Sequence, residues 1–294
     1  MKFWFFGFFL PLWGWSQTLF WHPDTIPNCK KTWIVCGASV GIVASLYTYT
    51  GISWYSNVPR TNFHFFDDSR EWKQMDKVGH SWTAFQQSKM ANELFTWAGH
   101  KIKTRVWITA LSGFCFQLPL EIFDGFTQKW GASWTDILAN ASGSLLATAN
   151  LIAFRKQVIQ LRFSFHPTSY SKQYPELFGK GITSTFKDYN GQTYWLSVDL
   201  HHLFFQQTKY PAWLGISFGY GAHGLEGGYH QTDWAIIQQR EFRQWYLSPE
   251  IFFSKINTKK LGFKILFFAL DSLHFPFFAI EWNKHYMKFH WIYF

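Results

Sequence analysis

The chain has 294 residues, a net charge of +9 and an aromatic content of 22%, and only 15% of its residues are charged. This charged fraction is low for a soluble domain, yet the mean hydropathy of −0.12 is also too low for a plain bundle of apolar membrane helices. High aromatic content with intermediate hydropathy favours a surface half in lipid. The positive net charge favours an anionic partner such as a membrane lipid or lipopolysaccharide. Nucleic acid is not expected, because the chain has no zinc-finger spacing and no basic helix.

The N-terminal segment 1–16, MKFWFFGFFLPLWGWS, is predicted to be a signal peptide. A lysine precedes a short apolar run, and Gly14 and Ser16 place small residues where signal peptidase requires them, so the mature chain would begin at Gln17. The alternative is an uncleaved anchor, although the run is short for a membrane span. No cysteine lies within the segment, so lipid attachment there is not expected.

The next apolar segment, TWIVCGASVGIVASLYTYTGISWY, is long enough for a membrane-spanning helix. A wholly buried helix of a globular domain is an equally good interpretation. Gly37 and Gly41 form a small-residue pair that favours close approach of another helix, so tight packing is expected. Cys29 and Cys36 are able to form a disulfide only if the chain turns between them, and Cys115 is expected to be a buried small apolar residue.

A helix start is predicted at Asp68, with Glu71 three residues later completing a capping box. The helix that follows is expected to end near Gly99. It carries Asp76 and His80 four residues apart, which places the two side chains on one helix face.

Two further apolar helices are predicted at residues 105–126 and 133–154, the second starting at Ser133 or Thr135. Their polar residues also stand three or four apart, and they are Glu121, Asp124, Asp136 and Asn140. The N-terminal part of the mature chain, 17–158, is therefore expected to be a bundle of about four apolar helices.

From about residue 160 the apolar residues alternate with polar or small ones, which predicts strands with one apolar face. The clearest examples are TYWLSVDLHH, LGISFGYG, QWYLSPEIFF, FPFFAIEW and YMKFHWIYF. A helix-like stretch, NTKKLGFKILFFALDSL, interrupts them, with Asn257 or Thr258 as its cap. The fold class is thus α+β, with an antiparallel β-rich region over 159–294. Its sheet either packs on the helical half or resembles outer-membrane β-structure.

The charged residues of the helical half are expensive to bury unless they are paired. The economical solution is for their helix faces to meet in one polar pocket, in which Lys77 and His80 offset the carboxylates. The predicted pocket residues are Asp76, Lys77, His80, Glu121, Asp124, Asp136 and Asn140.

The sequences DKVGH, EIFDGF and WGASWTDILANASGS resemble the motif series of the YfiM-like family of predicted periplasmic proteins, over roughly residues 60–200. KDYNGQTYWLS fits larger members from Gram-negative envelopes. The order of the polar motifs in the helical half is also similar to VanZ-like membrane proteins. These resemblances imply an exported protein of the periplasm or outer membrane of a Gram-negative bacterium, and lipid or lipid-linked ligands. The enterobacterial YfiM-like members are lipoproteins, from which this chain departs by lacking a signal cysteine.

Three functions follow from these patterns. The first is a binding protein that holds a lipid head group, or a partner such as an outer-membrane protein complex, in the polar pocket. The second is a hydrolase in which His80 and the carboxylates bind a divalent metal or exchange protons with a lipid substrate. The third is a structural envelope component. No resident cofactor is predicted, and no residues are assigned as metal ligands.

Overall fold

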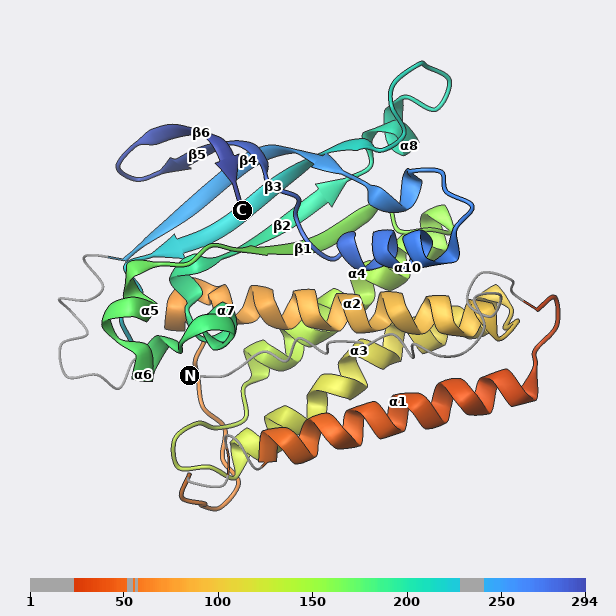
Figure 1. The fold of residues 1–294 in the computed structure, drawn as a ribbon. Helices are drawn as coiled ribbons and strands as arrows, with labels where there is room; N and C mark the ends of the chain where they lie inside the picture. Colours follow the sequence, from red (N-terminus) through yellow and green to blue (C-terminus); the bar gives the residue numbers. More distant parts are fainter. Residues whose placement is uncertain (1–23, 52–54, 56–57, 228–240) are drawn as a thin grey trace. The chain divides into compact units, whose positions relative to one another are not determined.

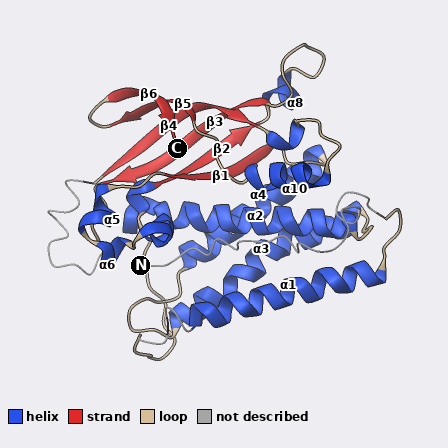
Figure 2. Ribbon diagram, viewed as in Figure 1, coloured by secondary structure: helices blue, strands red, loops and turns tan. Residues whose placement is uncertain are grey.

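The computed structural model describes residues 24–51, 55, 58–227 and 241–294, which form two compact units (Figure 1). The helical unit comprises the described residues up to Asp68 together with Thr83–Arg155. The sheet unit comprises Ser69–Trp82 and the described residues from Lys156 to Phe294. The predicted signal peptide and the cleavage site at Gln17 lie outside the described residues. The predicted α+β class is confirmed (Figure 2).

The helical unit is built from four helices: α1 (Cys29–Thr50), the larger part of α2 (Met75–Trp97), α3 (Ile102–Gly125) and α4 (Trp134–Phe154). Of these, α1, α3 and α4 are long and apolar enough to cross a membrane. Ser133 caps α4 by accepting a hydrogen bond from the Asp136 backbone N–H at 3.1 Å, as its side-chain type predicts. Pro119 lies inside α3, which nevertheless continues to Gly125.

Three helices of this unit approach one another at Gly113 of α3. A Cβ atom placed there would lie 2.1 Å from the backbone oxygen of Ala84 on α2 and 2.6 Å from Oγ of Ser144 on α4. The Gly113 N–H also donates a hydrogen bond to Oγ of Ser88 at 3.1 Å. Because no side chain fits in that space, glycine sets the distance between the helices at this point.

Two predictions for the helical unit are wrong. Among the described residues no atom lies within 4 Å of a Cβ atom placed at Gly37 or Gly41, so this pair does not pack against another helix. Cys115 is exposed and not buried, because it lies on a face of α3 that the described residues leave open. Cys29 and Cys36, two turns apart on α1, form no disulfide, as expected for a helix that does not turn back.

A six-stranded antiparallel sheet, in which each strand pairs with the next along the chain, forms the sheet unit. Its strands are β1 (Ile159–Phe165), β2 (Gln192–Val198), β3 (Leu214–His223), β4 (Phe242–Ile251), β5 (Phe277–Asn283) and β6 (Met287–Tyr293). All five strands predicted individually are present as β2–β6. The intervening helices are α5 (Ser169–Gln173), α6 (Pro175–Phe178), α7 (Ser184–Lys187), α8 (Leu200–Phe204) and α10 (Leu261–Leu270), with short 3₁₀ turns between them. The N-cap of α10 is Lys260, so neither Asn257 nor Thr258 caps it.

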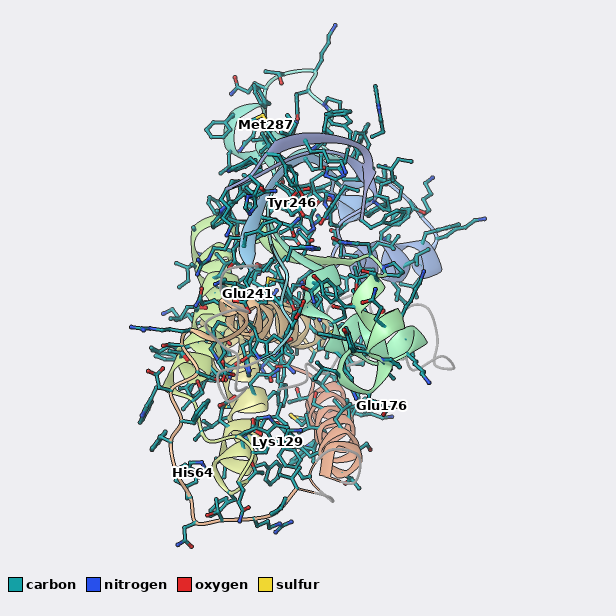
Figure 3. The ribbon with its side chains drawn as sticks, turned by 90° about the vertical axis from the view of Figure 1, so that its left-hand side faces the viewer. His64, Lys129, Glu176, Glu241, Tyr246 and Met287 are labelled. Carbon is teal, nitrogen blue, oxygen red and sulfur yellow. The ribbon has the colours of Figure 1, made fainter. Side chains whose placement is uncertain are left out.

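The two faces of the sheet differ in polarity, and the more polar one is buried. This buried inner face carries hydroxyl, carboxyl and aromatic side chains. The sheet is curved, so that the hydroxyl of Tyr293 on β6 lies 2.9 Å from Oγ1 of Thr193 on β2. Tyr246, labelled in Figure 3, is 1% exposed at the centre of this side. On the other side Met287, also labelled there, is 76% exposed. Apolar side chains therefore face outward, in the opposite sense to the sheet of an ordinary soluble protein.

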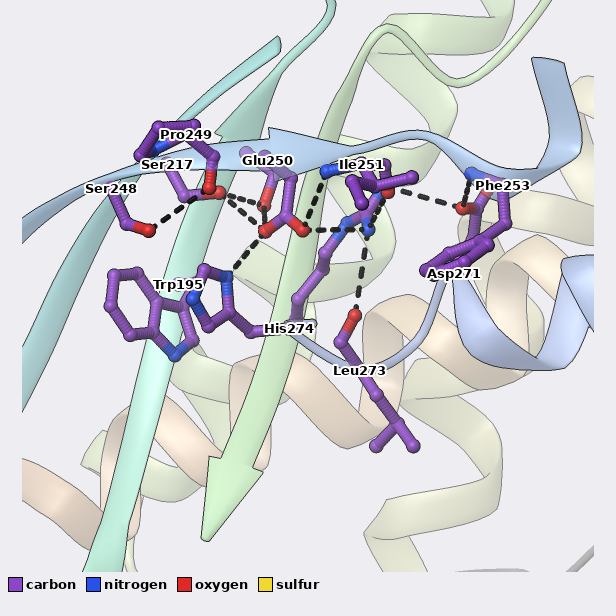
Figure 4. A network of polar contacts seen from close by, with 12 residues as sticks. Trp195, Ser217, Ser248, Pro249, Glu250, Ile251, Phe253, Asp271, Leu273 and His274 are labelled. Carbon is purple, nitrogen blue, oxygen red and sulfur yellow. Dashed lines mark hydrogen bonds and ion pairs between the residues drawn. The ribbon is translucent and has the colours of Figure 1, made fainter. Parts of the chain in front are cut away.

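A charged network holds the inner side together (Figure 4). The guanidinium of Arg162 on β1 contacts Glu250 on β4 at 3.2 Å and Asp271 at 3.4 Å, and all three side chains are at most 1% exposed. His274 lies 2.7 Å from the other oxygen of Glu250 and stacks on Trp195. That carboxylate also accepts hydrogen bonds from Ser197 and Ser217. The network pairs the buried charges of Arg162 on β1 and Glu250 on β4 and draws in serine hydroxyls from β2 and β3, so it ties four strands together and is central to the stability of the unit. Sequence alternation alone did not predict it.

The stability of the sheet unit is expected to fall as the pH drops from about 4.5 towards 2. Burial acts to raise the pKa of Glu250, but Arg162, His274 and Ser217 together hold it at about 2. A lowered pKa stabilises the folded state above the unfolded value, and this contribution, roughly 3 kcal/mol, is lost on protonation. Denaturant titrations at several pH values measure it. Because other carboxylates also protonate on acidification, the difference in unfolding free energy between wild type and Glu250→Gln is followed as a function of pH. If this difference did not change with pH, the assignment to Glu250 would be wrong.

Candidate functional site

The first predicted cluster lies at the start of α2, in the sheet unit. Asp76 and His80 are 3% and 4% exposed. The ammonium of Lys77 lies 2.9 Å from Oδ2 of Asp76. Oδ1 of Asp76 accepts a hydrogen bond from the hydroxyl of Tyr189 at 3.0 Å. The carboxylate is therefore both charge-compensated and fixed in orientation.

Tyr189 was not predicted as a site residue, and the loop that carries it is tightly held. Asp188 accepts hydrogen bonds from the backbone and side-chain amides of Asn190, both at 3.1 Å, and another from Thr168. The side chain of Asn190 in turn donates a hydrogen bond to the backbone oxygen of Leu225 and accepts one from its backbone N–H. Burial raises the pKa of Asp188 despite these donors. The sequence analysis noted the segment KDYNGQTYWLS, which contains Tyr189, only for its family resemblance and assigned no role to any of its residues.

The helix carrying Asp76 begins differently from the prediction. Trp72, Lys73 and Gln74 adopt φ values of 51°, 49° and 63°, in the left-handed region, and α2 starts only at Met75. Asp68 is not its N-cap; its Oδ1 instead accepts hydrogen bonds from the hydroxyls of Ser133 and Thr135. The capping box failed because these hydroxyls engage the carboxylate that was expected to cap the helix.

Several side chains of the sheet unit hold this left-handed turn in place. The ring of Trp72 packs on Tyr189 with centroids 5.3 Å apart. Lys73 forms an ion pair of 3.0 Å with Glu241, and the backbone oxygen of Lys73 accepts a hydrogen bond from the hydroxyl of Tyr220. Left-handed backbone at non-glycine residues costs free energy and persists only where the surroundings enforce it. Here the left-handed backbone turns the chain immediately before Asp76. The contacts with the sheet unit therefore fix the position from which the Asp76 side chain extends.

The second cluster lies in the helical unit, around the start of α4. The backbone N–H of Ser133 donates to Oε2 of Glu121 at 3.2 Å, and Oγ of Ser133 donates to Asp68 and accepts from the Asp136 N–H. Ser133 therefore links residues from the 58–68 connection, α3 and α4. Asp124 accepts a hydrogen bond from the hydroxyl of Tyr55 at 2.9 Å.

Six of the seven predicted pocket residues are at most 5% exposed, and they are Asp76, His80, Glu121, Asp124, Asp136 and Asn140. The seventh, Lys77, has a side chain that is 11% exposed. The structure brings Asp76, Lys77 and Tyr189 together in one unit, and Glu121 and Asp136 together in the other through Ser133. Union of the two clusters in one pocket stays a prediction.

The seven predicted pocket residues lie in the part of the chain that resembles a known family. Residues 64–152 match the family described as predicted periplasmic lipoprotein (DUF2279). The match is shorter than the expected span of 60–200 and covers Asp76, His80 and every pocket residue of α3 and α4. It identifies an envelope family of unknown function, without bearing on the YfiM-like and VanZ-like names. An exported protein of the periplasm or outer membrane, as predicted, fits this description. No curated protein and no solved structure matches the chain.

Proposed function

We propose that this chain is an envelope protein that binds the head group of a membrane lipid in a single polar pocket. The pocket would combine both clusters and contain Asp76, Lys77, His80, Glu121, Asp124, Asp136 and Asn140. The observation that supports it best is the burial of five ionisable groups among helices of which two, α3 and α4, are apolar enough to cross a membrane. Ionisable residues are costly in such a setting and usually serve a ligand.

The charges of the pocket favour a particular kind of head group. Four carboxylates stand against Lys77 and His80, so a bare phosphate would meet an excess of negative charge. A head group carrying both phosphate and ammonium resolves this, because the cationic side chains contact the phosphate and the carboxylates hold the ammonium. Phosphoethanolamine has this chemistry, whether it belongs to a phospholipid or decorates lipopolysaccharide.

The test is native mass spectrometry of the full chain purified in mild detergent. Wild type is expected to retain phosphatidylethanolamine, and His80→Ala and Asp136→Asn to lose it, at least about tenfold. Glu176→Gln is the matched control, because Glu176 is exposed on α6 of the sheet unit. Equal lipid retention in all four proteins would refute the pocket, and a co-purified protein in place of lipid would favour the partner interpretation.

A second candidate is a metal- or acid/base-dependent hydrolase acting on a lipid or lipid-linked substrate. It is favoured by Asp76 and His80, a buried carboxylate and imidazole four residues apart on α2, which are groups of the kind that hold divalent ions. The hydrogen bond from Tyr189 to Asp76 would orient such a ligand. Elemental analysis of the same wild-type and His80→Ala preparations separates the candidates, since the hydrolase predicts bound metal that disappears with the imidazole.

A further inference from the structure

The outer face of the sheet carries an unbroken row of apolar side chains. Strand pairing places one residue of each strand from β2 to β6 directly beside the next, and the row is Leu196, Phe218, Leu247, Ile280 and Phe289. Their exposed fractions lie between 37% and 46%. At the start of the sheet, Trp82 of α2 packs on Phe163 and Tyr194 and covers that end of the face. The remaining strands present the row openly.

The neighbouring rows are ordered by polarity. Two residues further along the strands, on the same face, Tyr220, Trp245 and Trp282 form an aromatic row. Beyond it, at the ends of these strands, stand the exposed cationic side chains of Arg243 and Lys284. Passing along the strands one therefore meets a row of leucine, isoleucine and phenylalanine side chains, then the tyrosine and tryptophan row, then the cationic side chains. A membrane surface shows this order from its hydrocarbon to its interface and its anionic head groups.

The alternative explanation for an apolar face, a poorly packed core, does not fit the inner side. There the buried residues include Arg162, Glu250 and Glu281, each at most 2% exposed and each hydrogen-bonded. A sheet that buries its charges and exposes its apolar side chains follows the alternation of lipid-facing β-structure.

A second element of the same unit behaves in the same way. Helix α10, LGFKILFFAL, has no buried residue, and its Phe263 and Leu266 are 47% and 48% exposed. Lys260 precedes it. An apolar helix with no fully buried residue, beside a lysine, suits the interfacial region of a bilayer.

We propose that the outer face of the sheet, from Leu196 to Phe289, lies in the acyl-chain region of one leaflet of a bilayer with anionic lipid head groups. Rows of side chains on one face are about 7 Å apart along a strand. Three such rows span roughly 14 Å, about half of the hydrocarbon core, so the sheet enters one leaflet and does not cross. This surface is distinct from the polar pocket, so loss of head-group binding in His80→Ala would leave it unchanged.

The test uses the full chain in vesicles of phosphatidylethanolamine and phosphatidylglycerol, with Cys29, Cys36 and Cys115 replaced by serine. A fluorescent NBD label is attached at Leu247→Cys, at Ile280→Cys or at the control Glu176→Cys. At the first two positions a nitroxide on the lipid acyl chain is expected to quench at least about fivefold more than at the control, and aqueous iodide less.

Either of two results would overturn the proposal. Iodide quenching at Leu247 and Ile280 equal to that at the control would show that the face lies in water. Protection from both quenchers would show that protein covers it, as in association with a second copy. Because all three positions are exposed, the substitutions are not expected to unfold the protein, and circular dichroism confirms this.

Discussion

Glu250→Gln is expected to lower the melting temperature of the chain in detergent by about 10 °C. The substitution removes the negative charge that Arg162 contacts at 3.2 Å in a fully buried site. Asp271 remains as a partner at 3.4 Å, but it also accepts the backbone N–H groups of Phe253 and Ser254. Leaving a buried cation partly unpaired typically costs about 3–5 kcal/mol, because its desolvation is no longer compensated.

Circular dichroism in the strand region measures this effect, and Glu176→Gln serves as its control because Glu176 is exposed. The same neutralisation at the exposed site should leave the melting temperature within about 1 °C. If Glu250→Gln melted with the wild type, the network of Figure 4 would not be a main source of stability in the sheet unit.

The sequence predicted most of the secondary structure because its patterns are local. Ser133 caps α4 through a hydrogen bond to a residue three positions away, and the alternation in LGISFGYG defines β3 without reference to the rest of the fold. Alternation does not tell which face of a strand is buried. That choice depends on partners far along the chain, such as Arg162 and Glu250, which are 88 residues apart.

The same distinction explains the candidate site. Helical spacing correctly placed Asp76 with His80 on α2, since both belong to one helix. It failed for Asp68, whose partners Ser133 and Thr135 are 65 and 67 residues away. It also missed Tyr189, which contacts Asp76 across 113 residues. A local capping rule cannot weigh such competitors, and the left-handed turn before Met75 has no local signal, because none of its three residues is glycine.

Small-residue patterns mislead for a related reason. Gly37 and Gly41 have the spacing of a helix-packing motif yet meet no described atom, whereas Gly113, which stands in no such motif, meets two neighbouring helices. A pair of small residues at this spacing shows only that a second helix could approach closely without a steric clash. Whether a second helix uses the space depends on the rest of the unit.

Gly113→Ala is therefore expected to destabilise the helical unit by about 3 kcal/mol, seen as a fall of roughly 8 °C in the melting temperature. The added Cβ would lie 2.1 Å from the Ala84 backbone oxygen, which cannot move without separating α2 from α3. Gly37→Ala is the matched control, since open space surrounds it among the described residues. Alanine favours helix by about 1 kcal/mol over glycine, so the two substitutions should differ in sign. Circular dichroism of the helices measures both, and a stabilised Gly113→Ala would mean that helix propensity outweighs packing there.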